Sequence, residues 1–206
     1  AAIWMQYLTA YGALVAYSAV NENDRVLITA ASSSVGLAAI QICKSVKAQV
    51  IASTRKSDKS SFLREAGADA VIVTDEEDLP TRVHELTEGK GTTITFDPVA
   101  GPFLEKLAEA AGQEGVIYEY GALSSQPTPF PLFPALRKGL TIRGYTLFEI
   151  VQNPKKRAEG QKFVYEGLKK GHFKPIIDST FPLHDIQKAH RHMESNTQRG
   201  KIVVSI

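Results

Sequence analysis

The sequence has little cysteine, little tryptophan and no large excess of either charge. Cys43 is the only cysteine among 206 residues, which excludes an internal disulfide and a zinc cluster built from cysteines. The formal net charge is +2 and no basic stripe runs along the chain, so a nucleic-acid partner is not indicated. No apolar run reaches the ~18 residues of a membrane span, and no signal peptide is visible. We therefore expect a cytoplasmic protein with neither a membrane nor a nucleic-acid partner.

Apolar segments recur along the chain in a regular order. Hydrophobic residues make up 43% of the sequence and charged residues 22%, which is ordinary for a globular protein with a buried core. Short β-branched segments alternate with segments of helical period, and this predicts an α/β fold with a doubly wound, parallel, six-stranded sheet. The expected strands cover residues 25–30, 49–53, 70–73, 93–96, 115–120 and 140–144.

The remaining segments are expected to surround this sheet. Residues 1–20 are helix-prone and apolar nearly all round, and Trp4, Leu8, Tyr11 and Val15 fall on one helical stripe that we expect to be core. Four prolines within residues 126–134 predict an extended surface loop. The expected C-terminal elements are a helix over 154–170, a strand over 176–181, a helix over 184–194 and a strand over 201–206.

Residues 25–55 form the unit around which the chain is organised. They run from a strand through a turn of small residues into a helix and a second strand, within about 30 residues. This order is typical of a unit that binds a dinucleotide, with the pyrophosphate over the helix N-terminus. Of the fingerprint Gly-x-Gly-x-x-Gly only the last glycine is kept, since the three positions hold Ala31, Ser33 and Gly36. On this motif alone, cofactor binding and a plain βαβ crossover both remain open.

Cations rather than acids follow the second expected strand. An NAD-binding chain usually places Asp or Glu there, to accept the adenosine ribose hydroxyl. Here Ser53 leads into Arg55 and Lys59, and the first acid is Asp58. Hydroxyl groups and cations suit a 2′-phosphate, which predicts NADPH rather than NADH as the cofactor. The alternative is a solvated run of charge at the start of the next helix.

Seven blocks, in this order, resemble the medium-chain dehydrogenase/reductase superfamily, and within it the zinc-independent quinone oxidoreductase-like branch. The blocks are LTAYGAL (8–14), AASSSVGLAAIQ (30–41), FLREAGAD (62–69), FDPVAG (96–101), PIIDSTFPL (175–183), AHRHMES (189–195) and GKIVV (200–204). The second block is similar to the family's AAAGGVGLAAIQ loop, with Ser33 and Ser34 in place of the paired glycines. The resemblance covers the whole chain.

The resemblance implies a division of the chain and a mode of assembly. Residues 1–150 would form a Rossmann-type NAD(P)-binding domain with its leading helix. Residues 151–206 would complete a substrate domain related to the GroES fold, whose N-terminal part has no counterpart here. We therefore expect the chain to be an excised part of a longer protein. The family also implies a homodimer that pairs through the sixth strand.

The resemblance also assigns cofactor-binding residues, position by position. At the two phosphate sites it places Ser33, Ser34 and Val35 on the pyrophosphate, and Ser53, Arg55 and Lys59 on the 2′-phosphate. Val99 would pack on the adenosine side. Around the nicotinamide it places Thr9 and the main chain of Tyr120, Tyr145 and Leu147, with Asn196 and Lys201 closing the site. The two serines depart from the family pattern, which puts the affinity of the loop in question.

A zinc site is not expected. Zinc-dependent relatives carry a cysteine ligand four residues before the threonine of the LTAY block, and that position is Met5, a poor zinc ligand. His190 and His192 are two residues apart, so on a helix they point to different sides. The other histidines are scattered along the chain, and the ligand set of a catalytic zinc is missing.

The leading functional hypothesis is an NADPH-dependent oxidoreductase that transfers hydride to a small-molecule substrate, a quinone, an enone or a similar activated double bond. Tyr118, Tyr120 and Tyr145 are candidate proton donors, but each also suits a structural role, so no catalytic residue is assigned. The alternative is a non-catalytic NADPH-binding sensor or interaction module, which the two serines of the phosphate loop favour. We expect residues 1–206 by themselves to be poorly active.

Overall fold

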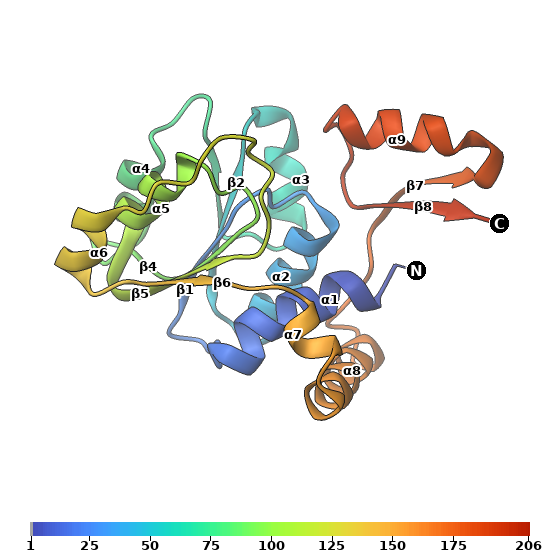
Figure 1. Ribbon diagram of the computed structural model, residues 1–206, viewed down its shortest axis with the longest axis horizontal. Coiled ribbons are helices and arrows are strands. Elements are labelled where there is room, and N and C mark those ends of the chain that lie inside the picture. Colours follow the sequence, from blue (N-terminus) through green and yellow to red (C-terminus); the bar gives the residue numbers. More distant parts are fainter. Residues whose placement is uncertain (1) are drawn as a thin grey trace.

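The computed structural model describes residues 2–206 and confirms the α/β class (Figure 1). Six parallel strands form one sheet in the order β3-β2-β1-β4-β5-β6, the order of a doubly wound dinucleotide-binding fold. The strands are β1 (Arg25–Ile28), β2 (Gln49–Thr54), β3 (Ala70–Val73), β4 (Thr92–Asp97), β5 (Ala111–Glu119) and β6 (Thr141–Gly144). The strand order reverses between β1 and β4, which is therefore the topological switch point.

Helices cover both faces of the sheet. They are α1 (Trp4–Tyr11), α2 (Ser34–Ser45), α3 (Ser60–Glu65) and α8 (Pro154–Lys169) on one face, and α4 (Leu79–Leu86) and α5 (Phe103–Ala110) on the other. Val26 of β1 shares a core cluster with Leu37 of α2, whereas the next residue, Leu27, shares the opposite cluster with Leu107 of α5. Successive strand residues point to opposite faces, which explains the continuous apolar run of β1. No helix within residues 2–206 is both long and apolar enough to cross a membrane.

The turn from β1 into α2 replaces two glycines of the fingerprint, by Ala31 and Ser33, and keeps the third, Gly36. Ala30, just before the motif, takes a left-handed conformation with φ of 43°, which glycine would adopt without strain. Gly36 cannot be replaced, because an added Cβ would lie 2.6 Å from the carbonyl oxygen of Ala31. The last glycine of the motif therefore allows α2 to pack closely against the end of β1, as the sequence predicts.

The N-terminal helix changes its period at Gly12. α1 continues directly into a π-helix, Gly12–Tyr17, and such turns are rare. At Gly12 the helix lies against the ring of Tyr145, which an added Cβ would overlap. The stripe predicted to be core is only partly so, since Leu8 is buried but Trp4 is 46% exposed. The helical period predicts which residues lie on one side of the helix. It does not predict which of them the rest of the protein covers.

The loop predicted over 126–134 is wrong at its C-terminal end. Residues 121–131 have no regular structure and are mostly exposed, but α6 (Leu132–Lys138) begins before the last proline. Pro134 is the third residue of α6, in the first turn, where a backbone N–H has no partner within the helix. Proline therefore disrupts nothing at this position, although it would in the interior of a helix.

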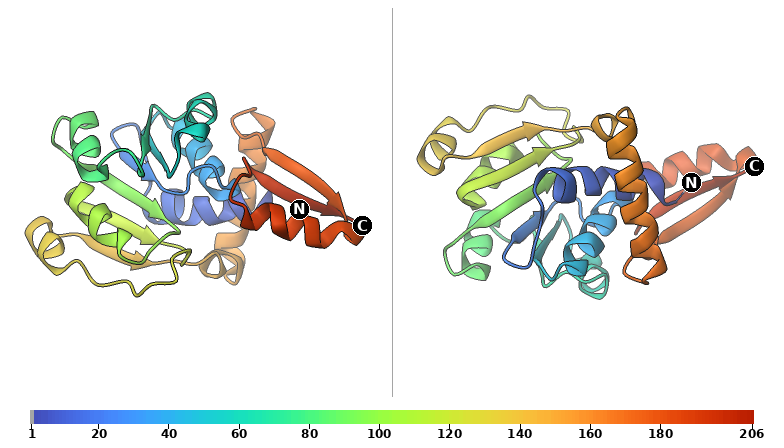
Figure 2. Two further views of the ribbon diagram at one scale, coloured as in Figure 1. Left: turned by 90° about the horizontal axis from the view of Figure 1, so that it is seen from above. Right: turned by 90° about the horizontal axis from the view of Figure 1, so that it is seen from below.

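A small C-terminal unit projects from the main body (Figure 2). In it, β7 (Ile177–Pro182) and β8 (Lys201–Ser205) form a two-stranded parallel sheet, and α9 (Ile186–Glu194) connects them. His192 of α9 contacts Asp178 of β7, with 2.6 Å between Nε2 and Oδ2, and this contact holds the helix on the sheet.

The predicted domain boundary at residue 150 stays a prediction. It falls within α7 (Phe148–Val151), and α8 beyond it packs on α1, where Gly160 faces Leu8. Val164 of α8 and Phe173 belong to the same core cluster as β1. By its packing, α8 is therefore part of the main body.

Candidate functional site

A cleft of about 920 Å³ lies along the carboxyl ends of the strands. Parallel α/β sheets bind ligands at this edge, near the switch point. The sheet supplies one wall, and residues 193–198, at and just after the end of α9, supply the other. The lining includes Thr29, Ala30, Ser32, Ser33, Ser53, Arg55, Lys59, Thr74, Val99, Phe103, Leu123 and Asn196.

The N-terminus of α2 lies at this cleft. Ser33 is the N-cap residue, and its Oγ accepts a hydrogen bond of 3.0 Å from the N–H of Gly36. The N–H groups of Ser34 and Val35 in the first turn donate to no acceptor in the part of the chain that the structure describes. Free N–H groups at the positive end of a helix dipole fit the oxygens of a pyrophosphate.

Arg55 directly follows β2 and lines the cleft with an unpaired cation. Ser53 is buried at the same strand end, and both residues line the cleft. The exposed Arg55 guanidinium forms no hydrogen bond or ion pair with any other residue in 2–206. Its N–H donors are thus available to a planar anion such as a phosphate group.

Lys59 reaches the same cleft with its donors already used. Its Nζ lies 3.2 Å from Ser32 Oγ, 2.6 Å from the carbonyl oxygen of Asn196 and 3.1 Å from that of Gln198. An ammonium group has three N–H donors, so these acceptors saturate it. Burial also lowers the pKa of Lys59. A phosphate would have to displace one of these contacts to bind Lys59.

These contacts fasten the C-terminal unit to the phosphate loop. The N–H of Gly200 donates to the carbonyl of Ser32 at 3.2 Å, and the Arg199 guanidinium donates to the carbonyl of Asp58 at 3.0 Å. The segment around Asn196 is thereby held across the cleft as its outer wall.

Loop 98–101 lines the cleft beyond the end of β4, through Val99. The fully buried Asp97 holds this loop, because its Oδ2 accepts hydrogen bonds from the N–H groups of Val99 (2.9 Å) and Ala100 (2.6 Å). Its Oδ1 accepts a hydrogen bond from the Thr29 hydroxyl, across the switch point. Asp97 is the last residue of β4 and binds Thr29, which directly follows β1, so it connects loop 98–101 to both central strands.

The structure divides the predicted site residues into two groups. Those that line the cleft are Ser33, Ser53, Arg55, Lys59, Val99 and Asn196, with Ser34 and Val35 directly following Ser33. Those away from its lining are Thr9, Tyr120, Tyr145, Leu147 and Lys201. Thr9 is buried in α1, and its hydroxyl donates to the carbonyl oxygen of Met5. The hydroxyl of the buried Tyr145 donates to the carbonyl oxygen of Leu8 at 3.5 Å. The residues predicted for the nicotinamide thus lie outside the large cleft.

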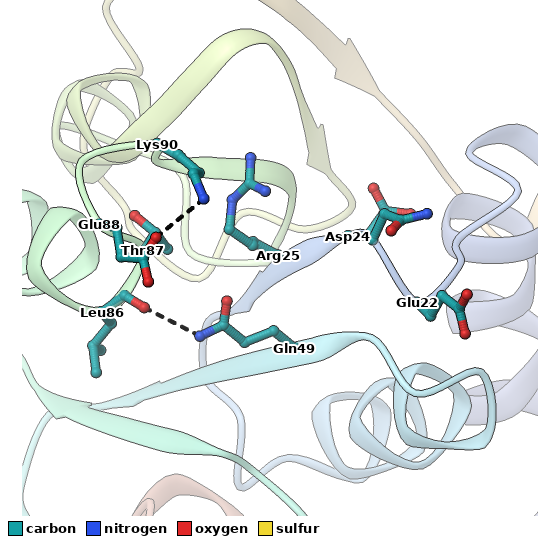
Figure 3. A pocket seen from close by; sticks show the side chains of 9 residues that line it. Glu22, Asp24, Arg25, Gln49, Leu86, Thr87, Glu88 and Lys90 are labelled. Carbon is teal, nitrogen blue, oxygen red and sulfur yellow. Dashed lines mark hydrogen bonds and ion pairs between the residues drawn. The ribbon is translucent and has the colours of Figure 1, made fainter.

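A smaller cleft of about 260 Å³ lies at the opposite edge of the sheet (Figure 3). It is formed where β1 and β2 begin, at Arg25 and Gln49. Gln49 Nε2 donates to the carbonyl of Leu86 at 3.2 Å, and Arg25 Nε donates to that of Gly91 at 2.7 Å. Because these groups are paired within the protein and lie at the amino ends of the strands, the larger cleft is the candidate functional site.

Known proteins share both the sequence pattern and this fold. A family model described as zinc-binding dehydrogenase matches residues 34–160. The chain belongs to this family. It is 27% identical to a 2-haloacrylate reductase of a Burkholderia species over 206 residues, which is 99% of this chain and 62% of that protein. The resemblance to the medium-chain dehydrogenase/reductases of the quinone oxidoreductase type is confirmed.

Two solved structures place this chain among larger relatives. An Escherichia coli quinone oxidoreductase complexed with NADPH matches with a TM-score of 0.91 and 26% identity, over 99% of this chain and 64% of that one. An NAD-dependent alcohol dehydrogenase matches with a TM-score of 0.89 and 30% identity, over 100% of this chain and 57% of that one. The chain spans about three fifths of the length of these relatives.

The family name refers to zinc, which proteins bind through His, Cys, Asp and Glu side chains. Within residues 2–206, no three His, Cys, Asp or Glu side chains gather so that they could hold a metal ion. Met5 stands 46% exposed on α1, and Cys43 is buried in α2. That this chain holds no catalytic zinc stays a prediction.

Sequence reasoning missed two contributors to the site. Ser32 binds Lys59 through its hydroxyl and Gly200 through its carbonyl, and no local pattern announces partners so distant in the chain. Glu119, at the end of β5, has its carboxyl oxygens buried beside Asp97. Its signal was visible, since an acid directly ends an apolar strand at this point. A charged residue in such a place is rarely left without a partner.

Proposed function

We propose that this chain binds NADPH in the large cleft and forms the cofactor-binding part of an oxidoreductase. The observation that carries the proposal is that the α2 N-terminus, with the free N–H groups of Ser34 and Val35, opens on the same cleft as the free guanidinium of Arg55. A dinucleotide with a 2′-phosphate needs both kinds of anion site. The first would take the pyrophosphate and the second the 2′-phosphate, with Val99 on the adenosine side.

The proposed reaction is hydride transfer to a quinone, an enone or a similar activated double bond. When bound, the cofactor supplies the hydride, and the protein supplies position and shields the site from water. Relatives named quinone oxidoreductase and 2-haloacrylate reductase support this substrate class. In the alternative, a sensor or interaction module, the chain would bind NADPH and catalyse nothing, which turnover assays distinguish.

NADPH should bind at least tenfold more tightly than NADH, a difference of about 1.4 kcal/mol. The reason is the unpaired Arg55 guanidinium and the lack of an acid at the end of β2. Arg55→Ala should weaken NADPH and leave NADH nearly unchanged. Titration calorimetry with both dinucleotides measures the four dissociation constants.

Two further variants control this experiment. Lys59→Met should weaken NADPH less than Arg55→Ala does, because the donors of Lys59 are bound to the protein. Arg64→Ala removes an exposed cation of α3 outside the cleft and should change neither dinucleotide. Equal dissociation constants of the unmodified chain for NADPH and NADH would contradict the proposed cofactor.

We also propose a homodimer that forms through β6. This strand is at the edge of the six-stranded sheet and has a neighbour, β5, on one side only. Nearby apolar side chains are exposed, among them Phe133 (79%) and Leu136 (72%) of α6, and an exposed apolar patch usually marks an interface. Sedimentation velocity at micromolar concentration should give twice the chain mass of 22.5 kDa. A single species at the chain mass would refute the dimer.

A further inference from the structure

Glu119 is a half-buried residue whose carboxyl group is buried and has no donor in the described chain. Neither of its carboxyl oxygens is exposed, and neither meets an N–H or O–H donor among the described residues. The group that it faces is Asp97, its neighbour in register on β4. Two carboxylates side by side in a poorly solvated place repel each other, so one of the pair retains a proton.

The hydrogen bonds of Asp97 decide where that proton resides. Asp97 accepts from the N–H groups of Val99 and Ala100 and from the Thr29 hydroxyl, and a group with three donors is favoured as the carboxylate. Glu119 has no such donors and is therefore the protonated member. Burial, and in second place the charge of Asp97, raises the pKa of Glu119 to about 9.

We propose that protonated Glu119 is a positioning residue for the cofactor cleft: it donates a hydrogen bond to Asp97, and Asp97 holds loop 98–101 in place. Val99 of this loop lines the cleft. Ala100 has φ of 56°, a conformation that a non-glycine residue keeps only where the surrounding contacts impose it. The inference rests on the proposed cofactor function, because it assigns the loop a part in holding NADPH.

The direction of the pH effect follows from the raised pKa. A carboxyl group with a raised pKa in the folded protein is neutral below that value and charged above it. The hydrogen bond from Glu119 to Asp97 is therefore present at neutral pH and is lost progressively as the pH rises through the raised pKa, when like charges replace it. Loop 98–101 loses its support on the alkaline side only.

Other charged groups near Glu119 do not offset this change. Tyr120 directly follows β5, and burial raises its pKa. Arg143 of β6 lies on the other face of the sheet, with its guanidinium 3.8 Å from the centre of the Tyr17 ring. Lys106 of α5 forms no ion pair with Glu119, and its charge helps to lower the pKa of Asp78. Asp97 remains the charged group that Glu119 faces.

Calorimetric titration with NADPH from pH 7 to pH 10 tests the proposal on the unmodified chain and on Glu119→Gln. Glutamine keeps an N–H donor for Asp97 but does not titrate, so the dissociation constant of the variant should depend less on pH. Between pH 8 and pH 10 the unmodified chain should lose about tenfold more affinity for NADPH than the variant. The reason is that only chains with protonated Glu119 hold the loop, and the apparent dissociation constant varies inversely with the fraction of such chains. Lys59 and Lys201 titrate in both proteins, so their effects cancel in the ratio of the two dissociation constants.

Glu65→Gln is the matched control, since Glu65 is an exposed acid on α3 outside the cleft. It should follow the unmodified chain at every pH. A ratio of dissociation constants between the unmodified chain and Glu119→Gln that stays constant from pH 7 to pH 10 would overturn the proposal.

A measurement without cofactor separates this inference from the proposed function. If the unmodified chain fails to bind NADPH at pH 7, the proposed function is refuted, and the proton on Glu119 is tested by carbon-13 NMR of its carboxyl group. A titration midpoint above pH 8 supports the protonated pair, and a midpoint below pH 8 overturns it. This reading uses the unmodified chain and so holds even if Glu119→Gln does not fold.

Discussion

Residues 1–206 alone should reduce a quinone or an enone with NADPH at least ~10³-fold more slowly than a form that also carries a GroES-like substrate domain. Hydride transfer needs the substrate at near-attack distance and water excluded, and lost positioning alone can cost several kcal/mol. The large cleft is walled on both sides where the phosphates and adenosine would lie. Thr9 and Tyr145, which the family resemblance places at the nicotinamide, are outside its lining.

Steady-state NADPH oxidation by both forms at saturating cofactor measures this difference. The dissociation constants for NADPH should differ far less than the turnover numbers, because the proposed phosphate contacts belong to residues 1–206. Comparable turnover would show that the whole active site lies within these residues. Turnover by neither form, with NADPH still bound, would favour the non-catalytic module.

Gly12→Ala should destabilise the fold by at least about 2 kcal/mol, as expected when a tightly packed site is overfilled. An added Cβ at Gly12 would overlap the Tyr145 hydroxyl and lie 2.7 Å from Cγ1 of Ile150. Both neighbours are buried, at 2% and 0% exposure, so neither side chain can swing into solvent. At an open helical position the same substitution would instead stabilise by roughly 1 kcal/mol. Urea unfolding followed by circular dichroism gives the change.

A control substitution at a second glycine and a rescue variant test whether the loss of stability comes from the overlap at Gly12. Gly144→Ala is the control, because nothing lies within 4 Å of an added Cβ there, and its effect should be small. Tyr145→Phe removes the overlapping oxygen, so the double variant Gly12→Ala/Tyr145→Phe should recover part of the lost stability. Equal losses at Gly12 and Gly144 would contradict the packing argument.

The strands of the sheet could be predicted from the sequence because their signal is local. Residues 70–73 are apolar throughout, since this strand is covered on both faces, and the structure has β3 at Ala70–Val73. Gly36 was identified for the same reason, as the close approach of α2 to β1 is built into the turn itself. The prediction of a loop over 126–134 was wrong at Pro134, because proline is tolerated in the first turn of a helix.

The candidate site could be predicted only as far as its residues are neighbours in the chain. Ser33, Ser53 and Arg55 follow directly from strand ends, and they line one cleft because the carboxyl ends of parallel strands meet at one edge. The use of Lys59 could not be predicted this way. Its acceptors at Asn196 and Gln198 are 137 and 139 residues away, and their approach depends on where the C-terminal unit folds back.

The sequence by itself thus determined the parallel sheet, the phosphate-binding turn and the basic strand end, since period, small residues and charge act within a few positions of one another. Only the tertiary structure decided that Lys59 fastens the outer wall of the cleft while Arg55 stays free. It alone paired Asp97 with Glu119, whose strands are adjacent and in register. Contacts of this kind depend on strand order and on the packing of distant segments, which no local pattern encodes.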